Sequence, residues 1–115
     1  MALCRIGAVA VPATHLLTKK DIVYRANCAG IKMVVTSAEG CFAASCEEAM
    51  PDCPTVEKLL IVDGARDGWL DFEALLAEES DEFPRPAEPL RHDDIMLLYF
   101  TSGTSGMPKM VGHNF

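Results

Sequence analysis

The sequence predicts an α/β fold in which a mostly parallel sheet is flanked by helices. Three short apolar runs, over residues 31–36, 58–63 and 95–100, are typical of strands buried on both faces. Stretches with helical spacing separate these runs, and alternation of strands and helices indicates a sheet covered on both sides. Half of the residues are hydrophobic, which is enough to form a packed core.

The first elements are predicted from local signals. Residues 1–6 are typical of the tail of a helix, and residues 8–11 form a short apolar strand. Thr18 and Asp21 have the spacing of a capping box, so a helix begins there. Gly30 is suited to end that helix, because glycine adopts the left-handed conformation at little cost.

The remaining elements follow the same alternation. A helix over residues 41–49 is ended by Pro51, and Asp71 can cap a short helix after the second apolar run. Trp69 is expected to anchor a loop against the sheet. Residues 80–94 are acidic and rich in proline, so they are predicted to form an exposed connection.

Composition excludes several classes of protein. At 115 residues the chain is at most one domain, and its net charge of −7 argues against a nucleic-acid partner. No apolar stretch is long enough for a membrane span. The five cysteines form no C-x-x-C pair, which predicts free, buried thiols in a reducing compartment, and we expect a cytoplasmic protein. They are Cys4, Cys28, Cys41, Cys46 and Cys53.

The segment after the third apolar run has the composition of a phosphate-binding loop. Glycines allow the backbone to approach an anion closely, hydroxyl groups donate hydrogen bonds, and a lysine supplies a positive charge. The predicted nucleotide-binding residues are Thr101, Ser102, Gly103, Thr104, Ser105, Gly106 and Lys109. The loop is not that of the P-loop nucleotidases, which have glycine before the lysine and serine or threonine after it. A flexible Ser/Gly linker would need neither the strand nor the lysine.

Residues 101–109 satisfy every position of the pattern [ST]-[SG]-G-[ST]-[ST]-G-x-P-[KR]. The segment therefore resembles the signature of the adenylate-forming superfamily, which includes acyl-CoA synthetases, luciferases and peptide-synthetase adenylation domains. The resemblance implies a ligase that uses ATP, Mg²⁺ and coenzyme A to activate a carboxylic acid. It also implies that residues 1–115 are a fragment of the large N-terminal domain of an acyl-CoA synthetase-like fold, with the C-terminal domain absent.

Two residues after the loop narrow the resemblance. His113 lies four positions after Lys109, and Met110 replaces the glycine found in most of the superfamily; both features are similar to medium-chain acyl-CoA synthetases. Acetyl-CoA synthetases, aryl-CoA ligases and other adenylation domains remain alternatives. A non-catalytic fragment that only binds phosphate is a further alternative, and the 115 residues alone are expected to be inactive.

The roles of several residues stay open at this stage. His113 is interpreted either as lining the acyl or phosphate site or as a histidine at the start of a helix. Tyr99 is expected in the core, and Lys109 could also be a solvated loop lysine. Asp93 and Asp94 lie at the far end of the last strand from the loop, which favours a solvated strand entry over a magnesium site. We assign no catalytic residue and no metal ligand within this chain.

Overall fold

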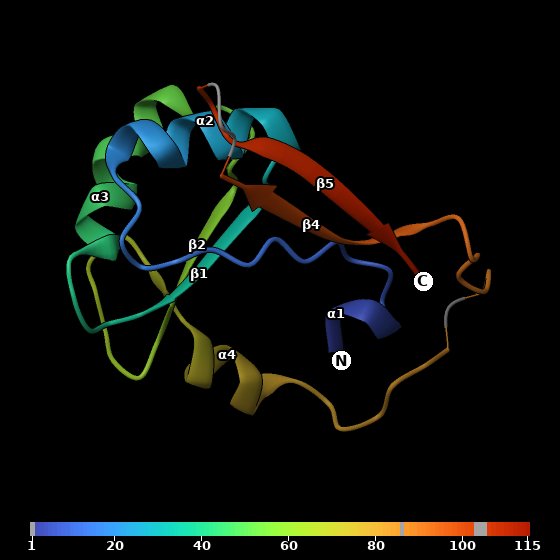
Figure 1. Ribbon diagram of the computed structural model, residues 1–115. Helices are drawn as coiled ribbons and strands as arrows, with labels where there is room; N and C mark the ends of the chain where they lie inside the picture. The colour runs from blue at the N-terminus through green and yellow to red at the C-terminus, as the bar shows by residue number, and fades with distance from the viewer. Residues whose placement is uncertain (1, 86, 103–105) are drawn as a thin grey trace. The chain divides into compact units, whose positions relative to one another are not determined.

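The computed structural model describes residues 2–85, 87–102 and 106–115 and divides the chain into two compact units. One unit consists of Thr14–Asp81, and the other of Met1–Ala13 together with Glu82–Phe115. Figure 1 shows the helices and strands of both units.

Helix α2, Lys19–Ala29, has the capping arrangement that the sequence predicts. The Thr18 hydroxyl accepts from the Asp21 amide, and the Asp21 carboxylate accepts from the Thr18 amide at 3.0 Å, so two helix-end donors are satisfied. Gly30 ends the helix at φ 60° and ψ 41°, in the left-handed region. The Thr18 hydroxyl also donates to the Asp21 carboxylate at 2.6 Å, and this hydrogen bond, followed by the one from the Thr18 amide, lowers the pKa of Asp21.

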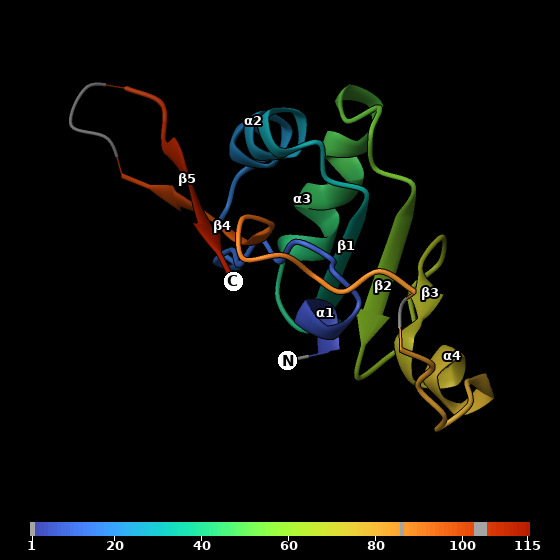
Figure 2. The same cartoon turned by 90° about the vertical axis from the view of Figure 1, so that its right-hand side faces the viewer.

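The first unit contains a parallel sheet in the order β1-β2-β3. Its strands are Met33–Ser37, Lys58–Val62 and the short Leu70–Asp71. Helix α3, Phe42–Ala49, and the 3₁₀ turn η1, Met50–Asp52, connect the first two strands, as parallel pairing requires a crossover. Figure 2 shows α2 and α3 beside one face of this sheet. The predicted α/β class with a parallel sheet and flanking helices is confirmed.

The core of this unit lies between the sheet and helices α2 and α3. Ile61 of β2 is completely buried, as is Cys46 of α3. Small side chains allow the helices to approach closely, and Trp69 closes the cluster with only 8% of its surface exposed. The prediction that Trp69 anchors its loop is therefore confirmed. The cluster also includes Ile22, Ala26, Ala43, Ala49 and Cys53.

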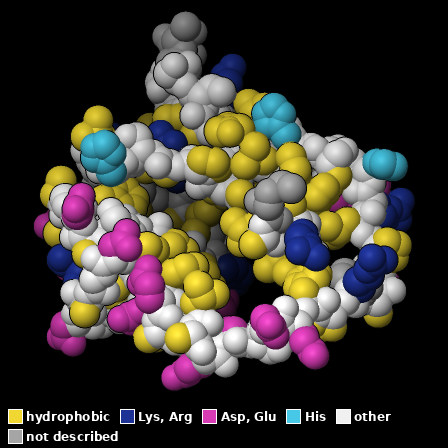
Figure 3. All heavy atoms as spheres, turned by 90° about the horizontal axis from the view of Figure 1, so that it is seen from below, with side chains coloured by type: hydrophobic (Ala, Val, Ile, Leu, Met, Phe, Trp, Pro, Cys, Tyr) yellow, Lys and Arg dark blue, Asp and Glu magenta, His cyan; other side chains and the backbone are white. Residues whose placement is uncertain are grey.

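A short helix, α4, follows the sheet at Phe72–Glu78. The Asp71 carboxylate accepts a hydrogen bond of 2.8 Å from the Ala74 amide, so the predicted cap is present. No helix or strand occurs among the described residues of the acidic connection, 80–94, which agrees with the prediction of an exposed loop. Figure 3 shows acidic and hydrophobic side chains side by side on one surface of the protein.

The second unit is built around an antiparallel hairpin. Helix α1, Ala2–Arg5, precedes the bridge residue Ala10, and strands β4, Ile95–Thr101, and β5, Lys109–Asn114, pair with each other. The expectation that the third apolar run belongs to the same parallel sheet as the other two is wrong. Among the described residues of this unit, parallel pairing is limited to the bridge between Ala10 and Leu97, and β4 pairs with β5 in the antiparallel direction. The strand expected over residues 8–11 is reduced to this bridge.

The cysteines differ from one another in burial. All five are free, and Cys46 and Cys53 are buried as expected, whereas Cys28 and Cys41 are exposed. Burial raises the pKa of the Cys46 thiol to about 11, so it is protonated at neutral pH. The expectation that the thiols are generally buried is wrong for the exposed pair. In the described part of the chain, no helix is both long and apolar enough to cross a membrane.

Candidate nucleotide-binding hairpin

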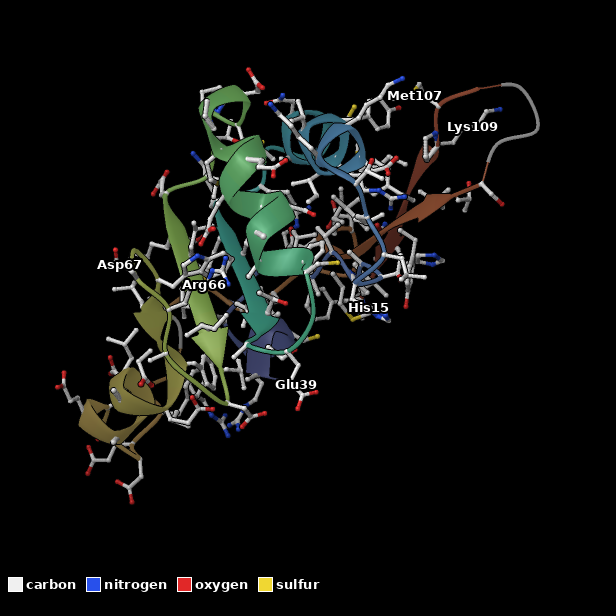
Figure 4. All side chains as sticks on the ribbon, turned by 90° about the vertical axis from the view of Figure 1, so that its left-hand side faces the viewer. His15, Glu39, Arg66, Asp67, Met107 and Lys109 are labelled. Atoms are coloured by element: carbon white, nitrogen blue, oxygen red, sulfur yellow. The ribbon has the colours of Figure 1, made fainter. Side chains whose placement is uncertain are left out.

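The predicted phosphate loop connects the two strands of the β4–β5 hairpin. Thr101 ends β4 and lies directly opposite Lys109, which begins β5. The Thr101 hydroxyl donates a 3.4 Å hydrogen bond to the Lys109 carbonyl oxygen, so the two strand ends are held together. Figure 4 shows Lys109 and Met107 beside this end of the hairpin. The strand-to-loop transition that the sequence predicts is therefore present.

The register places a hydroxyl group and an ammonium group on one face. Directly opposed residues of an antiparallel pair share a face and have closely spaced Cβ atoms. Thr101 and Lys109 are such a pair, and both are exposed. An anion at the tip of the hairpin could replace the Lys109 carbonyl oxygen as the acceptor of the Thr101 hydroxyl and pair with the ammonium.

The described part of the loop has the backbone expected for close approach to a ligand. Gly106 has φ 123°, a conformation that residues with a Cβ atom rarely adopt, and no atom lies within 4 Å of the position that a Cβ would take. Ser102 is exposed at the end of β4. Three of the predicted contacts, Gly103, Thr104 and Ser105, lie outside the described residues.

Tyr99 and His113 occupy positions that differ from those expected. Tyr99 is 42% exposed and is not part of the core. Successive side chains of a strand point to opposite faces, and the half-buried Phe100 lies on the other face of β4. His113 lies within strand β5, so its interpretation as a helix-start residue is wrong. The two rings contact each other edge to face, with centroids 5.7 Å apart and planes at 85°.

The aspartates before β4 form a local cap. The Arg91 amide donates to the Asp94 carboxylate at 2.8 Å, and the Arg91 guanidinium pairs with Asp93 at 3.1 Å. These contacts agree with a solvated strand entry. Among residues 2–85, 87–102 and 106–115, no three histidine, cysteine or acidic side chains are grouped so that they could hold a metal ion.

The first unit contains a polar cluster that was not predicted from the sequence. The Arg66 guanidinium donates to both carboxylate oxygens of Glu47, at 2.6 and 2.9 Å, and the Trp69 indole N–H donates to the same carboxylate at 2.8 Å. Hydrogen bonds from Arg66 and then Trp69 lower the pKa of Glu47 to about 2. Figure 4 shows Arg66 beside α3. No local spacing could have revealed contacts between residues 19 and 22 positions apart.

Comparison with known proteins identifies relatives along the whole chain. A family model described as AMP-binding enzyme matches residues 1–115. The mitochondrial acyl-coenzyme A synthetase ACSM5 of Rattus norvegicus is 39% identical over 115 residues, which cover 99% of this chain and 19% of the relative. The mitochondrial acyl-coenzyme A synthetase ACSM1 of Homo sapiens is 39% identical over 111 residues, which cover 96% of this chain and 18% of the relative. The chain thus spans about a fifth of the length of these relatives.

Solved structures agree with the sequence relatives. The anthranilate CoA ligase AuaEII in complex with anthranoyl-AMP has a TM-score of 0.84 and 23% identity, covering 96% of this chain and 21% of that one, which supports the fold. The Brucella canis acyl-CoA synthetase has a TM-score of 0.72 and 25% identity, and the match covers 97% of this chain and 20% of that one. The resemblance to adenylate-forming enzymes is confirmed. The expected cytoplasmic location is wrong, because the names of the relatives above place them in mitochondria.

Proposed function

Because the chain belongs to the AMP-binding enzyme family, we propose that it is part of an ATP-dependent acid–thiol ligase. The observation that supports this most directly is the register of the hairpin, which places Lys109 opposite Thr101 at the end of an apolar strand. Residues 1–115 would then be a fragment of the N-terminal domain, with the C-terminal domain supplied by further chain. The 115 residues alone would not complete the reaction.

The proposed reaction has two steps. A carboxylate oxygen of the acid attacks the α-phosphorus of ATP, the bond from that phosphorus to the β-phosphate oxygen breaks, and pyrophosphate leaves. The thiolate of coenzyme A then attacks the acyl carbon, and the bond between that carbon and the AMP oxygen breaks. The leaving pyrophosphate and AMP both carry negative charge, so positioned donors accelerate such steps.

The hairpin would hold the β- and γ-phosphates in the first step. The Lys109 ammonium pairs with the phosphate charge, the hydroxyl groups of Thr101 and Ser102 donate hydrogen bonds, and Gly106 leaves room for the ligand. Gly103, Thr104 and Ser105 are included in this proposal on the sequence pattern alone. Exposure of the described members is consistent with a binding role, because none is enclosed in the core.

Mg²⁺ and coenzyme A are proposed on the family resemblance. The described residues offer no group of ligands for a cation, so Mg²⁺ would arrive bound to the phosphates. No described residue is assigned to coenzyme A. Partners of the whole protein would thus be small molecules: ATP, coenzyme A and a carboxylic acid.

The acid is proposed to be a medium-chain fatty acid. Met110 and the spacing of His113 from Lys109 favour this substrate class. Acetyl-CoA synthetase, aryl-CoA ligase and other adenylation activities are the alternatives in the same reaction class. A fragment that binds phosphate without catalysis is the alternative outside it.

The test is acid-dependent exchange of pyrophosphate into ATP, measured on the full open reading frame with acetate, butyrate, octanoate and benzoate. We expect exchange with octanoate, and we expect Lys109→Ala to slow it about 10- to 100-fold, since a hydrogen bond to a charged group is worth about 1.5–3 kcal/mol. Lys32→Ala is the matched control, because Lys32 is an exposed lysine that pairs with Glu57. Exchange that is equally fast in Lys109→Ala and wild type would contradict the assignment.

A further inference from the structure

The face of the hairpin that includes Thr101 and Lys109 continues away from the loop. Side chains of a strand alternate between its two faces, so every second residue of β4 and β5 belongs to this surface. In order from the loop, it consists of the opposed pairs Thr101 with Lys109, Tyr99 with Val111, and Leu97 with His113. We call these six residues the hairpin face.

The hairpin face combines apolar surface with few polar groups. Val111 is 40% exposed and lies between Lys109 and His113 along β5. Leu97, opposite His113, is half-buried. Beyond the tip, the only polar atoms that the side chains of this face offer are the Tyr99 hydroxyl and the nitrogens of His113. Ligand sites typically have this composition, with an apolar wall and a small number of placed polar groups.

The polar ends of the aromatic pair have no described partner. Tyr99 and His113 contact each other edge to face at 5.7 Å, which fixes the two rings against each other. Within the described ranges, no hydrogen bond joins the Tyr99 hydroxyl or the His113 imidazole to another residue. The contact thus orients the imidazole while its N–H group remains able to donate to a ligand.

Distances along the strands separate this pair from the proposed phosphate contacts. At about 3.4 Å per residue, Tyr99 lies about 7 Å from Thr101, and His113 about 14 Å from Lys109. A ligand group at His113 is therefore not the phosphate group bound at Lys109. An apolar acid fits this surface better than a ribose, because a ribose has several hydroxyl groups and the face offers it few partners.

We propose that His113 binds the carboxylate of the acid substrate through its imidazole N–H, and that Tyr99 is a positioning residue that orients the imidazole. This inference rests on the proposed acid–thiol ligase function and extends it to the second substrate. It assigns the two ends of one hairpin face to two substrates, with ATP phosphates at the tip and the acid beyond them. His113 and Tyr99 then affect acid binding selectively.

The experiment measures pyrophosphate exchange by the full open reading frame, varying the acid at saturating ATP and varying ATP at saturating acid. His113→Phe preserves an aromatic ring beside Tyr99 but removes the donor. We expect its KM for the acid to rise about tenfold, the scale of one hydrogen bond to a charged group, while KM for ATP stays unchanged. Tyr99→Leu removes the edge contact and is expected to raise KM for the acid by a smaller factor. His113→Gln retains an N–H donor and is expected to recover part of the loss.

Asn114→Ala is the matched control, since Asn114 is exposed and directly follows His113 in β5, so its side chain lies on the opposite face of the strand. It is expected to leave both KM values unchanged. Circular dichroism checks that each variant folds, and His113→Leu gives the same comparison should His113→Phe not fold. An unchanged KM for the acid in the variant without a donor, or a rise in KM for ATP alone, overturns the inference while leaving the proposed function intact. Absence of exchange with every acid in the wild type overturns both.

Discussion

Replacing Ile61 with alanine should strongly destabilise the parallel-sheet unit. Ile61 is fully buried near the C-terminal end of β2, in the cluster formed with helices α2 and α3. The substitution removes three carbon atoms, each worth about 0.8 kcal/mol of transfer free energy. The cavity adds to this loss, and buried Ile→Ala substitutions cost about 2–5 kcal/mol in total. We therefore expect the free energy of unfolding to fall by about 3–4 kcal/mol.

The assay is urea unfolding of the full open reading frame, followed by far-UV circular dichroism. Ile61→Val is the matched control, because it removes a single methyl group at the same position and should cost about 0.5–1.5 kcal/mol. The midpoint shift, multiplied by the slope of the transition, gives each free-energy change. A loss below about 1 kcal/mol for Ile61→Ala, or equal losses for both variants, would refute the assignment of Ile61 to a closely packed core.

Two further predictions concern the first unit. The folded pKa of Glu47, about 2, is below its ordinary value of 4.5, so this carboxylate stabilises the fold above pH 5 and the contribution disappears as pH falls toward 2. Glu47→Gln should lower the neutral-pH melting temperature and flatten its dependence on pH over this window; parallel curves for variant and wild type would disprove this. Gly30→Ala should cost about 1 kcal/mol from backbone strain alone, since φ is 60° and no atom lies within 4 Å of an added Cβ. Chemical denaturation measures the loss in free energy of unfolding. Gly112→Ala is the control, because the φ of Gly112 is not left-handed, and equal losses for the two variants would argue against backbone strain at Gly30.

The sequence by itself determined the elements whose signals are local. The capping box of Thr18 and Asp21, the left-handed Gly30 and the cap at Asp71 each depend on hydrogen bonds or dihedral angles within a few residues. The apolar runs that became β1 and β2 are continuous, so their burial in a parallel sheet could be predicted. The composition of the loop after β4 is also a local signal, because its glycines, hydroxyl groups and lysine lie within nine residues; its role in binding phosphate stays a prediction.

Only the tertiary structure decided which strand edges pair and which side chains meet. An apolar run does not indicate which strands will lie beside it. After the loop, the chain returns along β4 as β5, and the two strands form an antiparallel hairpin. This pairing places Tyr99 against His113 on an exposed face. The contact of Glu47 with Arg66 likewise joins positions far apart in the sequence. Such contacts form only when the chain brings residues that are distant in sequence together, and no short sequence pattern signals this.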